Sequence, residues 1–301
     1  MKKPLTVTIG IPAYNEEQNI ALLIKDVLKQ KQKNYVLEKI LVASDGSSDN
    51  TVGIVNSLKN SQIEILDFKE RLGLATRLNN LIENSNSDCL IALNADIRLK
   101  GATTIKKLIA PILKGADLAA GNIVPTEPTN LLEKVLYVGC IYKNNILREY
   151  NNGDNYLSCH GPIRAFSKKL YKNLRFKFSA GEDTYSYLYC KKNNFKYVYA
   201  EKAEAIYKLP STLSDHLNQL HRFLNLNQNL DKEFGKNFVR QNMYIPKHLF
   251  ILEGVKIFTF YPLLSVAYAG LTFVVSAANL LIKKGELSET WGMVLSSKEV
   301  K

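Results

Sequence analysis

Apolar residues in the first hundred positions come in short continuous runs separated by longer amphipathic stretches. Between the runs, apolar side chains recur at helical spacing, as expected for helices that lie on a sheet. Strands that alternate with helices predict right-handed crossovers and a mainly parallel sheet. The expected fold class is therefore α/β, with a Rossmann-like sheet and flanking helices. The predicted strands are residues 5–11, 40–43, 63–66 and 88–93.

The last of these runs ends in Asn94-Ala95-Asp96. Its apolar residues predict a buried parallel strand, because a strand covered on both faces needs no polar alternation. If the chain stays extended just past the strand, Asn94 and Asp96 point the same way. They would then lie at the carboxyl edge, where open α/β sheets bind ligands. An acid after a strand also commonly forms a turn or caps a helix, so this pattern alone leaves both roles open.

Acid and amide side chains also follow the other predicted strands, including Asn15, Glu16, Asp45 and Asp49. Several strand ends therefore contribute to one polar rim. Asn15 with Gln18 three residues later predicts a capping box for the first helix. Neither G-x-G-x-x-G nor G-x-x-x-x-G-K-[ST] follows the first strand, which argues against a dinucleotide-binding or ATPase loop.

The pattern changes after residue 124, where Pro125 and Pro128 interrupt the chain and residues 131–147 predict a longer helix. We expect one large domain over residues 1–235 and C-terminal interfacial and membrane helices with a tail over 244–301. Residues 1–100 of the large domain look like a nucleotide-binding half, and residues 101–235, the acceptor half in the resemblance described below, make up the rest.

Residues 257–282 contain no charged side chain, and about twenty apolar residues suffice to cross a bilayer. This stretch predicts a membrane segment, preceded by an interfacial helix at residues 244–253. Pro262 and Gly270 leave open a kinked or re-entrant course, and lysines on both flanks leave the orientation undecided. A hydrophobic helical pair that completes a soluble core is the alternative.

The 301 residues are enough for one large domain or two modest ones, and the apolar fraction of 46% is that of a globular protein. The net charge of +12 suits phosphates or an anionic membrane surface. The lysines are spread along the chain and no nucleic-acid module is evident, so nucleic acid is not an expected partner. The cysteines lack paired short spacing, which predicts reduced thiols in a cytosolic protein. They are Cys89, Cys140, Cys159 and Cys190.

Four sequence blocks follow one another in the order IPAYNEE, SDGSSDNT, RLGLATRLNN and LIALNAD. They resemble the opening blocks of inverting family 2 glycosyltransferases, which have the A-type glycosyltransferase fold. The resemblance continues through GEDTYSY and QLHRF and so covers roughly residues 5–230. It implies transfer of a sugar from a nucleotide-sugar, with Mn²⁺ or Mg²⁺ as cofactor.

The resemblance also implies a donor site. The acid matching Asp45 contacts the base, usually uracil, whose imide hydrogen a carboxylate can accept. Pro12, Ala13 and Glu16 would line the same pocket, and Arg71 would approach a phosphate. Alternatively, Pro12 only marks a turn, Asp45 is a turn carboxylate and Arg71 is a solvated surface charge.

The D-x-D motif of the family is Asn-Ala-Asp in this chain. Asp96 matches the acid that holds a divalent metal on the diphosphate, and hard oxygen ligands suit magnesium or manganese. Asn94 keeps an acceptor but lacks charge, which predicts weaker metal binding or a metal bound only together with the nucleotide. An inactive relative is the alternative.

On the acceptor side, Gly161 lies in SCHGPIRAF, which resembles the block whose small residues admit the donor sugar. His160 either contacts a phosphate or sugar or is a buried structural histidine. Asp183 matches the general base, and Glu182 beside it would raise its basicity by like-charge repulsion. Alternatively, both acids simply favour a helix N-terminus.

Gln219, Arg222 and Phe223 fall at i, i+3 and i+4 and share a helix face. They resemble the Q-x-x-R-W element of membrane-associated members, in which arginine meets the diphosphate. Phe223 replaces tryptophan, so a ring remains beside the acceptor without the indole donor. The segment at Trp291 resembles a closing segment of membrane relatives. An amphipathic helix with a surface arginine and a disordered tail are the alternatives.

Taken together, these features predict a membrane-associated inverting glycosyltransferase that uses a UDP-sugar and has a cytoplasmic catalytic domain. The expected acceptor is a hydroxyl of a glycan or of a lipid-linked sugar. A polyprenyl-phosphate glycosyltransferase is an alternative, and its ionised acceptor would need no base. A catalytically inactive nucleotide-sugar-binding membrane protein is another.

Overall fold

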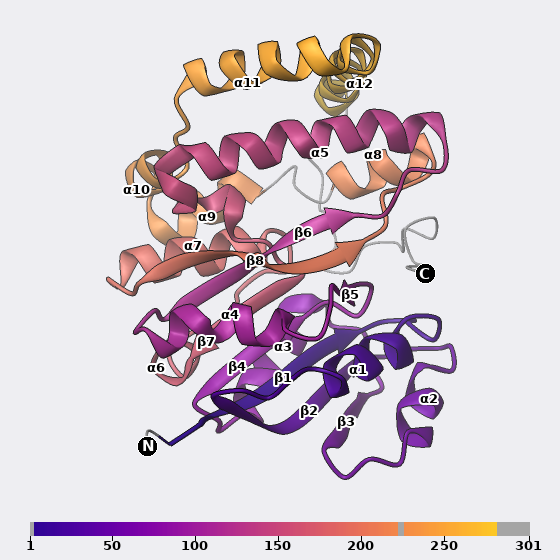
Figure 1. The fold of residues 1–301 in the computed structure, drawn as a ribbon, viewed down its shortest axis with the longest axis vertical. Coiled ribbons are helices and arrows are strands. Elements are labelled where there is room, and N and C mark those ends of the chain that lie inside the picture. Colours follow the sequence, from indigo (N-terminus) through magenta and orange to yellow (C-terminus); the bar gives the residue numbers. More distant parts are fainter. Residues whose placement is uncertain (1–2, 222–225, 282–301) are drawn as a thin grey trace.

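The apolar run before Asn94 forms the central strand β4 (Cys89–Leu93), in which all five side chains are buried. A computed structural model describes residues 3–221 and 226–281 of the chain. In it, eight strands form one sheet in the order β3-β2-β1-β4-β7-β6-β8-β5, with helices on both faces (Figure 1). The other strands are β1 (Leu5–Ala13), β2 (Tyr35–Asp45), β3 (Ile63–Phe68), β5 (Arg98–Leu99), β6 (Leu118–Pro125), β7 (Ile163–Ser167) and β8 (Tyr197–Tyr207).

The predicted α/β class with flanking helices is confirmed, and the sheet is mixed: four of its seven strand pairings are parallel, β6 with β8 among them, and three are antiparallel. The strands β3, β2, β1 and β4 are mutually parallel, as predicted for the first hundred residues. Strand β7 then runs antiparallel to both β4 and β6, and β5 runs antiparallel to β8. In this antiparallel pairing, Ile163 at the start of β7 lies opposite Leu93 at the end of β4. An apolar run of this length does not reveal the direction of the strand it forms.

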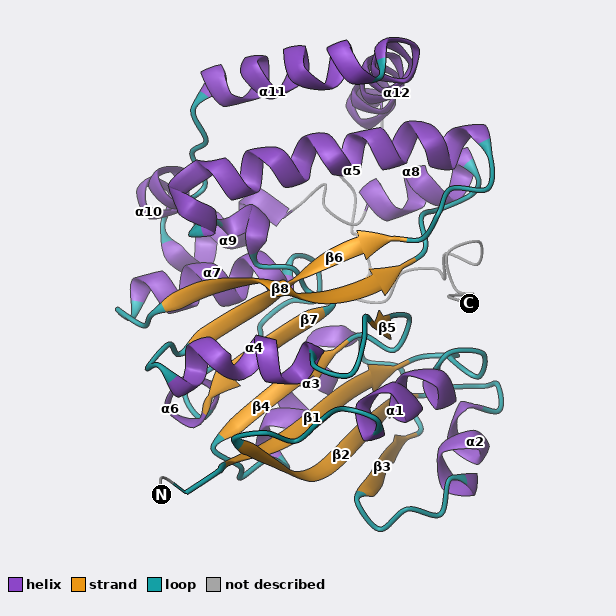
Figure 2. Cartoon of the chain, viewed as in Figure 1, coloured by secondary structure: helices purple, strands orange, loops and turns teal. Residues whose placement is uncertain are grey.

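Two buried clusters, one on each face of the sheet, form the core (Figure 2). Helices α1 (Ile20–Leu28), α2 (Thr51–Ser57) and α4 (Thr104–Leu113) contribute to the first cluster. The second cluster takes side chains from α3 (Leu74–Glu83), α6 (Lys168–Tyr171), α7 (Glu182–Lys192), α9 (Leu226–Phe234) and α10 (Lys236–Asn242).

A further layer of helices lies beyond the β6 and β8 side of the sheet (Figure 1). Its base is α5 (Leu131–Glu149), on which α11 (Lys247–Phe260) and α12 (Pro262–Leu281) pack. The chain returns from α5 through two short 3₁₀ turns, Tyr150–Gly153 and Tyr156–Ser158. Helix α8 (Leu213–His221) follows β8.

The predicted membrane segment at residues 257–282 is divided between α11 and α12. Tyr261 leaves the helical region at φ −136° and ψ 60°, because the residue before a proline is pushed out of the α conformation and Pro262 has no N–H to continue the ladder. Over the described residues, no helix combines the length and apolarity needed to traverse a bilayer. The prediction of one transmembrane helix is thereby corrected. One sheet runs through both halves of residues 1–235. The predicted domain bounds stay a prediction.

Candidate active site

The turns that carry the predicted polar side chains meet at one edge of the sheet. Strands β1, β2 and β4 are parallel, with Ala13 opposite Ser44 and Gly10 opposite Ala92. Because parallel strands end at the same edge, the turns after β1, β2 and β4 lie side by side. Asn94 extends this edge to β7, since its N–H donates to the carbonyl of Pro162 over 3.1 Å.

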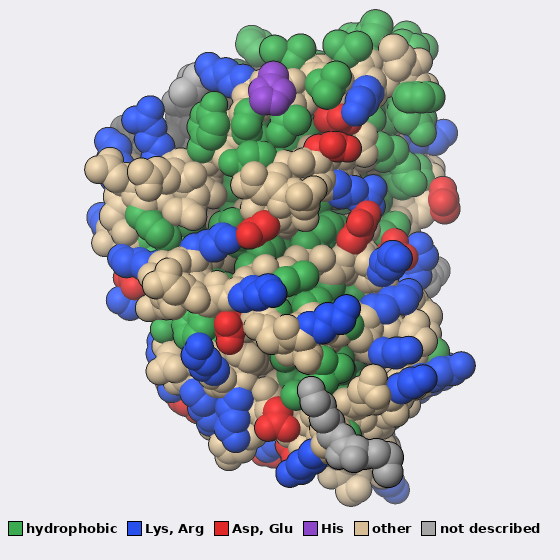
Figure 3. Space-filling model, turned by 60° about the vertical axis from the view of Figure 1, so that its left-hand side comes forward, with side chains coloured by type: hydrophobic (Ala, Val, Ile, Leu, Met, Phe, Trp, Pro, Cys, Tyr) green, Lys and Arg blue, Asp and Glu red, His purple; other side chains and the backbone are tan. Residues whose placement is uncertain are grey.

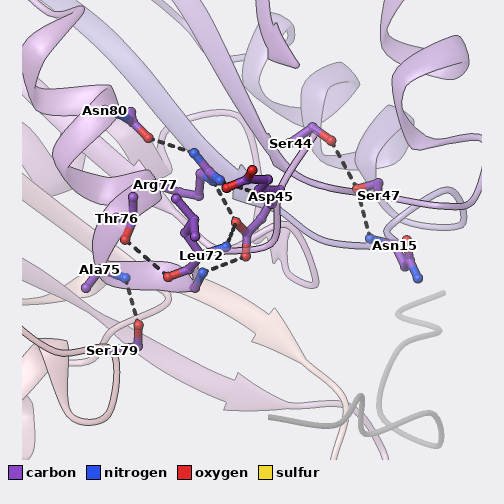
Figure 4. Close-up of polar contacts among 12 residues, drawn as sticks. Asn15, Ser44, Asp45, Ser47, Leu72, Ala75, Thr76, Arg77, Asn80 and Ser179 are labelled. Carbon is purple, nitrogen blue, oxygen red and sulfur yellow. Dashed lines mark hydrogen bonds and ion pairs between the residues drawn. The ribbon is translucent and has the colours of Figure 1, made fainter. Parts of the chain in front are cut away.

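The turn after β1 is tied to the turn after β2. Asn15 has a φ of 52°, and its N–H donates to Ser47 Oγ over 3.1 Å (Figure 4). Its side-chain oxygen accepts from the N–H of Ser48 over 2.8 Å. The predicted capping box is therefore wrong: α1 begins at Ile20, and the Asn15 side chain serves the neighbouring turn. Pro12 and Ala13 end β1, where Pro12 is half-buried and Ala13 is buried.

Glu16 is also buried in this turn. Its N–H donates to Thr51 Oγ1 over 2.8 Å, and its carboxylate accepts from Asn19 Nδ2 over 3.0 Å. Four positions are predicted to line a nucleoside pocket. Hydrogen bonds hold together the two turns at which they lie: Pro12, Ala13 and Glu16 at the first turn, and Asp45 at the end of β2.

Asp45, the last residue of β2, is buried and accepts three hydrogen bonds (Figure 4). Its Oδ1 accepts from the N–H of Leu72 over 2.8 Å and from Arg77 Nε over 2.7 Å, and its Oδ2 accepts from the N–H of Gly73 over 2.9 Å. A carboxylate offers about four lone-pair sites. Protein donors therefore use about three of the four lone-pair sites of Asp45.

Arg77 is the residue that sequence reasoning missed at this site. Its side chain is only 2% exposed, and it also donates to Asn80 Oδ1 over 3.0 Å and to the carbonyl of Glu70 over 2.6 Å. Its guanidinium lies over the Phe68 ring, 3.9 Å from the centroid. The signal was present, because the block RLGLATRLNN contains both arginines. Nothing in that block showed which of them would reach Asp45.

The predicted arginine of the same block, Arg71, lies against the first turn. Its guanidinium carbon is 3.7 Å from the centroid of the Tyr14 ring, a cation–π contact. Its proposed contact with a phosphate stays a prediction. Gly46 has a φ of 69°, and a Cβ there would lie 3.1 Å from the backbone nitrogen of Arg71. The loop at Gly46 therefore lies so close to the backbone at Arg71 that a side chain at position 46 would be crowded.

The loop before α7 is joined to the start of α3. Ser179 accepts a hydrogen bond from the N–H of Ala75 over 3.1 Å (Figure 4). Ala75 lies two residues beyond Gly73, which donates to Asp45. The support of Asp45 is thus connected to the segment that leads to Glu182 and Asp183.

Gly161 contacts the first residue of α7. A Cβ at Gly161 would lie 2.5 Å from Glu182 Oε1 and 3.7 Å from the Cβ of Asp183. Gly161 is followed by Pro162, which binds the N–H of Asn94. Through these contacts the structure brings the Asn94 turn, Gly161 and the two acids to one place. Asn94 and Asp96 are both half-buried there.

A fully buried arginine holds this junction. Arg164 Nε donates to the carbonyl of Gly161 over 3.2 Å, and its Nη1 donates to the carbonyl of Glu182 over 2.9 Å and to Ser186 Oγ over 2.7 Å. Its Nη2 lies 3.3 Å from Glu182 Oε1. Arg164 therefore fixes the acceptor-side turn against the start of α7.

Burial and the neighbouring Asp183 raise the pKa of the Glu182 carboxyl to about 7, against the opposing effect of Arg164. The predicted effect of Glu182 on the basicity of Asp183 stays a prediction. Asp183 is half-buried, and its Oδ1 accepts from the N–H of Thr184 over 2.6 Å. This is the bond expected of an acid at a helix N-terminus, and it leaves the second carboxylate oxygen for other partners.

His160 is buried, and burial together with Lys143 lowers its pKa to about 3. It is therefore neutral at ordinary pH, and its ring meets that of Tyr199 edge-on at 6.2 Å. These properties fit the buried structural histidine that was one of the two interpretations.

Four of the predicted residues belong to the C-terminal part of the site. Gln219 is half-buried on α8. Arg222, Phe223 and Trp291 lie outside the described residues, so their roles stay predictions. Within the described ranges, no three His, Cys, Asp or Glu side chains gather as a metal cluster. Asp96 and Asn94 offer oxygen donors at the strand edge.

Comparison with known proteins identifies the family. The family model for glycosyl transferase family 2 matches residues 8–175, more than half of the chain. The chain belongs to glycosyl transferase family 2. This confirms the resemblance seen in the sequence blocks, whereas the membrane-associated subgroup stays a prediction.

Two curated members of this family show how far the likeness extends. Poly-β-1,6-N-acetyl-D-glucosamine synthase of Staphylococcus aureus is 33% identical over 91 residues, which are 30% of this chain and 21% of the synthase. The chain therefore spans about a fifth of that relative. The Escherichia coli enzyme UDP-Glc:α-D-GlcNAc-diphosphoundecaprenol β-1,3-glucosyltransferase WfgD is 28% identical over 189 residues, which are 62% of this chain and 70% of WfgD.

Solved structures share the fold. The mannosyltransferase PcManGT from Pyrobaculum calidifontis, in complex with GDP-Man and Mn²⁺, aligns with a TM-score of 0.58 at 15% identity, covering 95% of this chain and 77% of the other. S. aureus TarS 1–349 in complex with UDP-GlcNAc aligns with a TM-score of 0.54 at 15% identity, covering 88% and 84%. At such low identity these likenesses establish the fold of the family and nothing finer.

Proposed function

We propose that this family 2 member transfers a sugar from a UDP-sugar, with inversion, to a hydroxyl of a glycan or lipid-linked acceptor at a membrane. The observation that carries the proposal is the buried Asp45 carboxylate at the end of β2, which three protein donors orient and whose remaining acceptor position would receive a donor of the base. A uracil imide N–H fits that position, and cytosine, which lacks this hydrogen, does not. Pro12, Ala13 and Glu16 would line the same pocket.

The chemistry requires a base and a stabilised leaving group. Asp183 would accept the proton of the acceptor hydroxyl as its oxygen bonds to the anomeric carbon, while the bond from that carbon to the diphosphate breaks. Attack from the side opposite the leaving group inverts the configuration. Arg164 would act as a positioning residue, since it holds Gly161 and Glu182, next to Asp183, in one arrangement. Gln219 and Arg222 would face the diphosphate, and Phe223 and Trp291 the acceptor.

A divalent cation, Mn²⁺ or Mg²⁺, fits the donor set at the end of β4. Asp96 supplies a carboxylate and Asn94 an amide oxygen, and both are hard donors of the kind these ions prefer. Two protein ligands suffice when phosphates complete the coordination. When bound, the ion would neutralise the developing charge on the departing diphosphate. Mn²⁺ is present with GDP-Man in the PcManGT structure.

The decisive test is a thermal-shift screen of UDP, CDP, GDP and their sugars, with and without Mn²⁺. A ligand that binds only the folded chain raises its melting temperature. We expect UDP to give the largest shift, Asp45→Asn to lose the preference of UDP over CDP, and Asp96→Ala to lose the Mn²⁺ dependence. Equal shifts for all nucleotides in the parent protein would contradict the proposal.

A polyprenyl-phosphate acceptor is the second candidate, whereas the name of WfgD describes a β-1,3 bond to a lipid-linked GlcNAc, which is a hydroxyl acceptor. The variant Asp183→Asn separates the two. A hydroxyl acceptor needs the base, so we expect turnover of this variant with a hydroxyl acceptor to fall by a factor of about 10²–10⁴. Undiminished turnover with a lipid phosphate would favour the second candidate, because that acceptor is already ionised.

Asn94 in place of an acid motivates a third candidate, an inactive nucleotide-sugar binder. Donor hydrolysis that requires Mn²⁺ and disappears in Asp96→Ala would exclude it.

A further inference from the structure

Large hydrophobic side chains gather on the outer side of α11 and α12. Of the eighteen large hydrophobic side chains that are exposed in the described chain, eleven lie between residues 250 and 274. Figure 3 shows hydrophobic side chains gathered at one end of the molecule, with Lys, Arg, His and Asp or Glu side chains near them. We call these eleven residues the apolar end face. They are Phe250, Ile251, Leu252, Val255, Phe258, Phe260, Tyr261, Leu263, Val266, Phe273 and Val274.

Helix α11 exposes large apolar side chains to solvent and buries an acidic one. Ile251 is 68% exposed and Phe260 is 78% exposed, whereas Glu253 on the same helix is fully buried. The Glu253 carboxylate forms an ion pair with Lys256 through Oε1, and its Oε2 has no hydrogen-bond partner in the described structure. Surface helices normally turn their apolar stripe inward. An apolar partner on the outer side of α11 would remove this inconsistency.

Contacts with α5 set the direction in which the apolar end face points. Tyr142 of α5 donates to the carbonyl of Phe250, and its ring meets that of Tyr268 at 6.4 Å. Tyr268 packs on Gly139, where a Cβ would lie 2.2 Å from the ring. Both helices therefore have α5 on one side and the apolar end face on the other.

The two helices also lie across the molecule. In Figure 1, α11 runs across the long axis and α12 is seen nearly along its own axis, so neither helix runs along the long axis. With fourteen residues, α11 is about 21 Å long, shorter than the roughly 30 Å of hydrocarbon in a bilayer. The break at Tyr261 separates it from α12. This geometry suits helices that lie in a plane.

A cationic segment precedes α11 in the chain and extends into its first residues. Lys236, Arg240, Lys247 and His248 are all exposed, and no acidic residue occurs from residue 236 to residue 252. Arg240 also lines a hollow of about 480 Å³ together with Asn237, Gln241 and Tyr244. Anionic lipid headgroups complement these cations.

We propose that α11 and α12 lie flat in the headgroup region of an anionic membrane leaflet, with the apolar end face inserted and the exposed cations of residues 236–248 on the lipid phosphates. The inference deepens the membrane location given under the proposed function, but it does not depend on sugar transfer. Interfacial helices of this kind insert about 5–10 Å into the boundary of the acyl chains. The rest of the chain would stay on one side of the membrane.

The test is sedimentation of the full chain with vesicles of phosphatidylcholine, with and without phosphatidylglycerol. We expect binding to the mixed vesicles, and a loss of at least about tenfold in affinity for the triple variant Ile251→Ser, Phe260→Ser and Leu263→Ser. These side chains are 68–84% exposed, so the fold should tolerate the change. Leu252→Ser and Leu113→Ser are matched singles, at 49% and 43% exposure. Only the first should weaken binding, because Leu113 ends α4 on the sheet.

The charge component is tested separately. Arg240→Gln and Lys247→Gln should each lower the affinity for the mixed vesicles by about fivefold, and added salt should have the same effect. Lys31→Gln and Lys33→Gln, which are exposed but lie in the nucleotide-binding half, should change nothing.

Three results would overturn the proposal. Unchanged vesicle binding by the triple variant would remove the apolar end face as the contact. A concentration-dependent dimer without lipid that the triple variant abolishes would assign the face to a second copy. Resistance to extraction by alkaline carbonate would indicate a crossing segment. The thermal shift with UDP is an independent readout. The triple variant should show the same UDP shift as the parent. If the parent itself showed no UDP shift, only the proposed function would be refuted.

Discussion

Replacing Arg77 by methionine should leave Asp45 as a buried carboxylate without its cation. In the folded chain the Arg77 and Asp45 side chains are only 2% and 8% exposed, and their atoms are 2.7 Å apart. Removing one partner of a buried pair typically costs 3–5 kcal/mol, because an uncompensated charge stays in the interior. The variant also loses the bond to the carbonyl of Glu70 and the contact with Phe68. We therefore expect the free energy of unfolding to fall by about 3–5 kcal/mol.

The assay is urea unfolding followed by circular dichroism, in which a shifted midpoint at an unchanged slope reports stability. The matched control is Arg98→Met. Arg98 forms two hydrogen bonds with Asp26, at 2.6 and 2.9 Å, where Arg77 forms one with Asp45, but the Arg98 side chain is 26% exposed. Water compensates the remaining charge there, so we expect a loss nearer to 1 kcal/mol.

A double-mutant cycle isolates the pair itself. Asp45→Asn alone should destabilise the chain by leaving Arg77 buried without its anion. The double variant Arg77→Met with Asp45→Asn should lose clearly less than the sum of the two single losses, because no buried charge remains. Additive losses, or a cost for Arg77→Met no larger than that for Arg98→Met, would refute the view that Arg77 holds Asp45.

Further predictions concern the junction of Gly161, Arg164 and Glu182. Gly161→Ala should destabilise the chain by about 1–3 kcal/mol and reduce transfer, because its Cβ would lie 2.5 Å from Glu182 Oε1; urea unfolding and a transfer assay check both. The raised pKa of Glu182 contributes stability that is fully present below about pH 4.5 and is lost as the pH rises through about 7. Glu182→Gln should therefore gain stability relative to the parent between about pH 5 and pH 8 in urea unfolding. Arg164→Met should cost more at about pH 8 than at about pH 5, because Glu182 is charged at the higher pH.

Each of these has its own control. Gly270→Ala adds the same methyl group where no atom lies within 4 Å, and it should stabilise α12 by up to about 1 kcal/mol. A Gly161→Ala protein as stable and active as the parent would show that Glu182 moves aside easily. A stability difference between Glu182→Gln and the parent that does not change with pH would mean that Glu182 does not titrate in this range. An equal cost of Arg164→Met at both pH values would separate Arg164 from that charge.

The sequence by itself determined the elements and the rim on which the site lies. Apolar runs indicate the strands, because a strand that is buried on both faces of a parallel sheet has no alternating polar residues, as in β4. The blocks around Asp45 and Asp183 likewise indicated the family, since each carries its chemistry in consecutive residues. Pro262 already pointed to a possible break in the C-terminal apolar segment.

Tertiary structure alone decided the partners of the charged residues. Arg77 and Asp45 are 32 positions apart, and Arg164 and Glu182 are 18 apart, so no local spacing rule links them. It also decided the direction of β7 and the outward face of α11, because both depend on which surface the rest of the chain offers for packing. A periodic pattern states which side chains share a face. Only the folded chain shows whether that face meets protein or is left for something else.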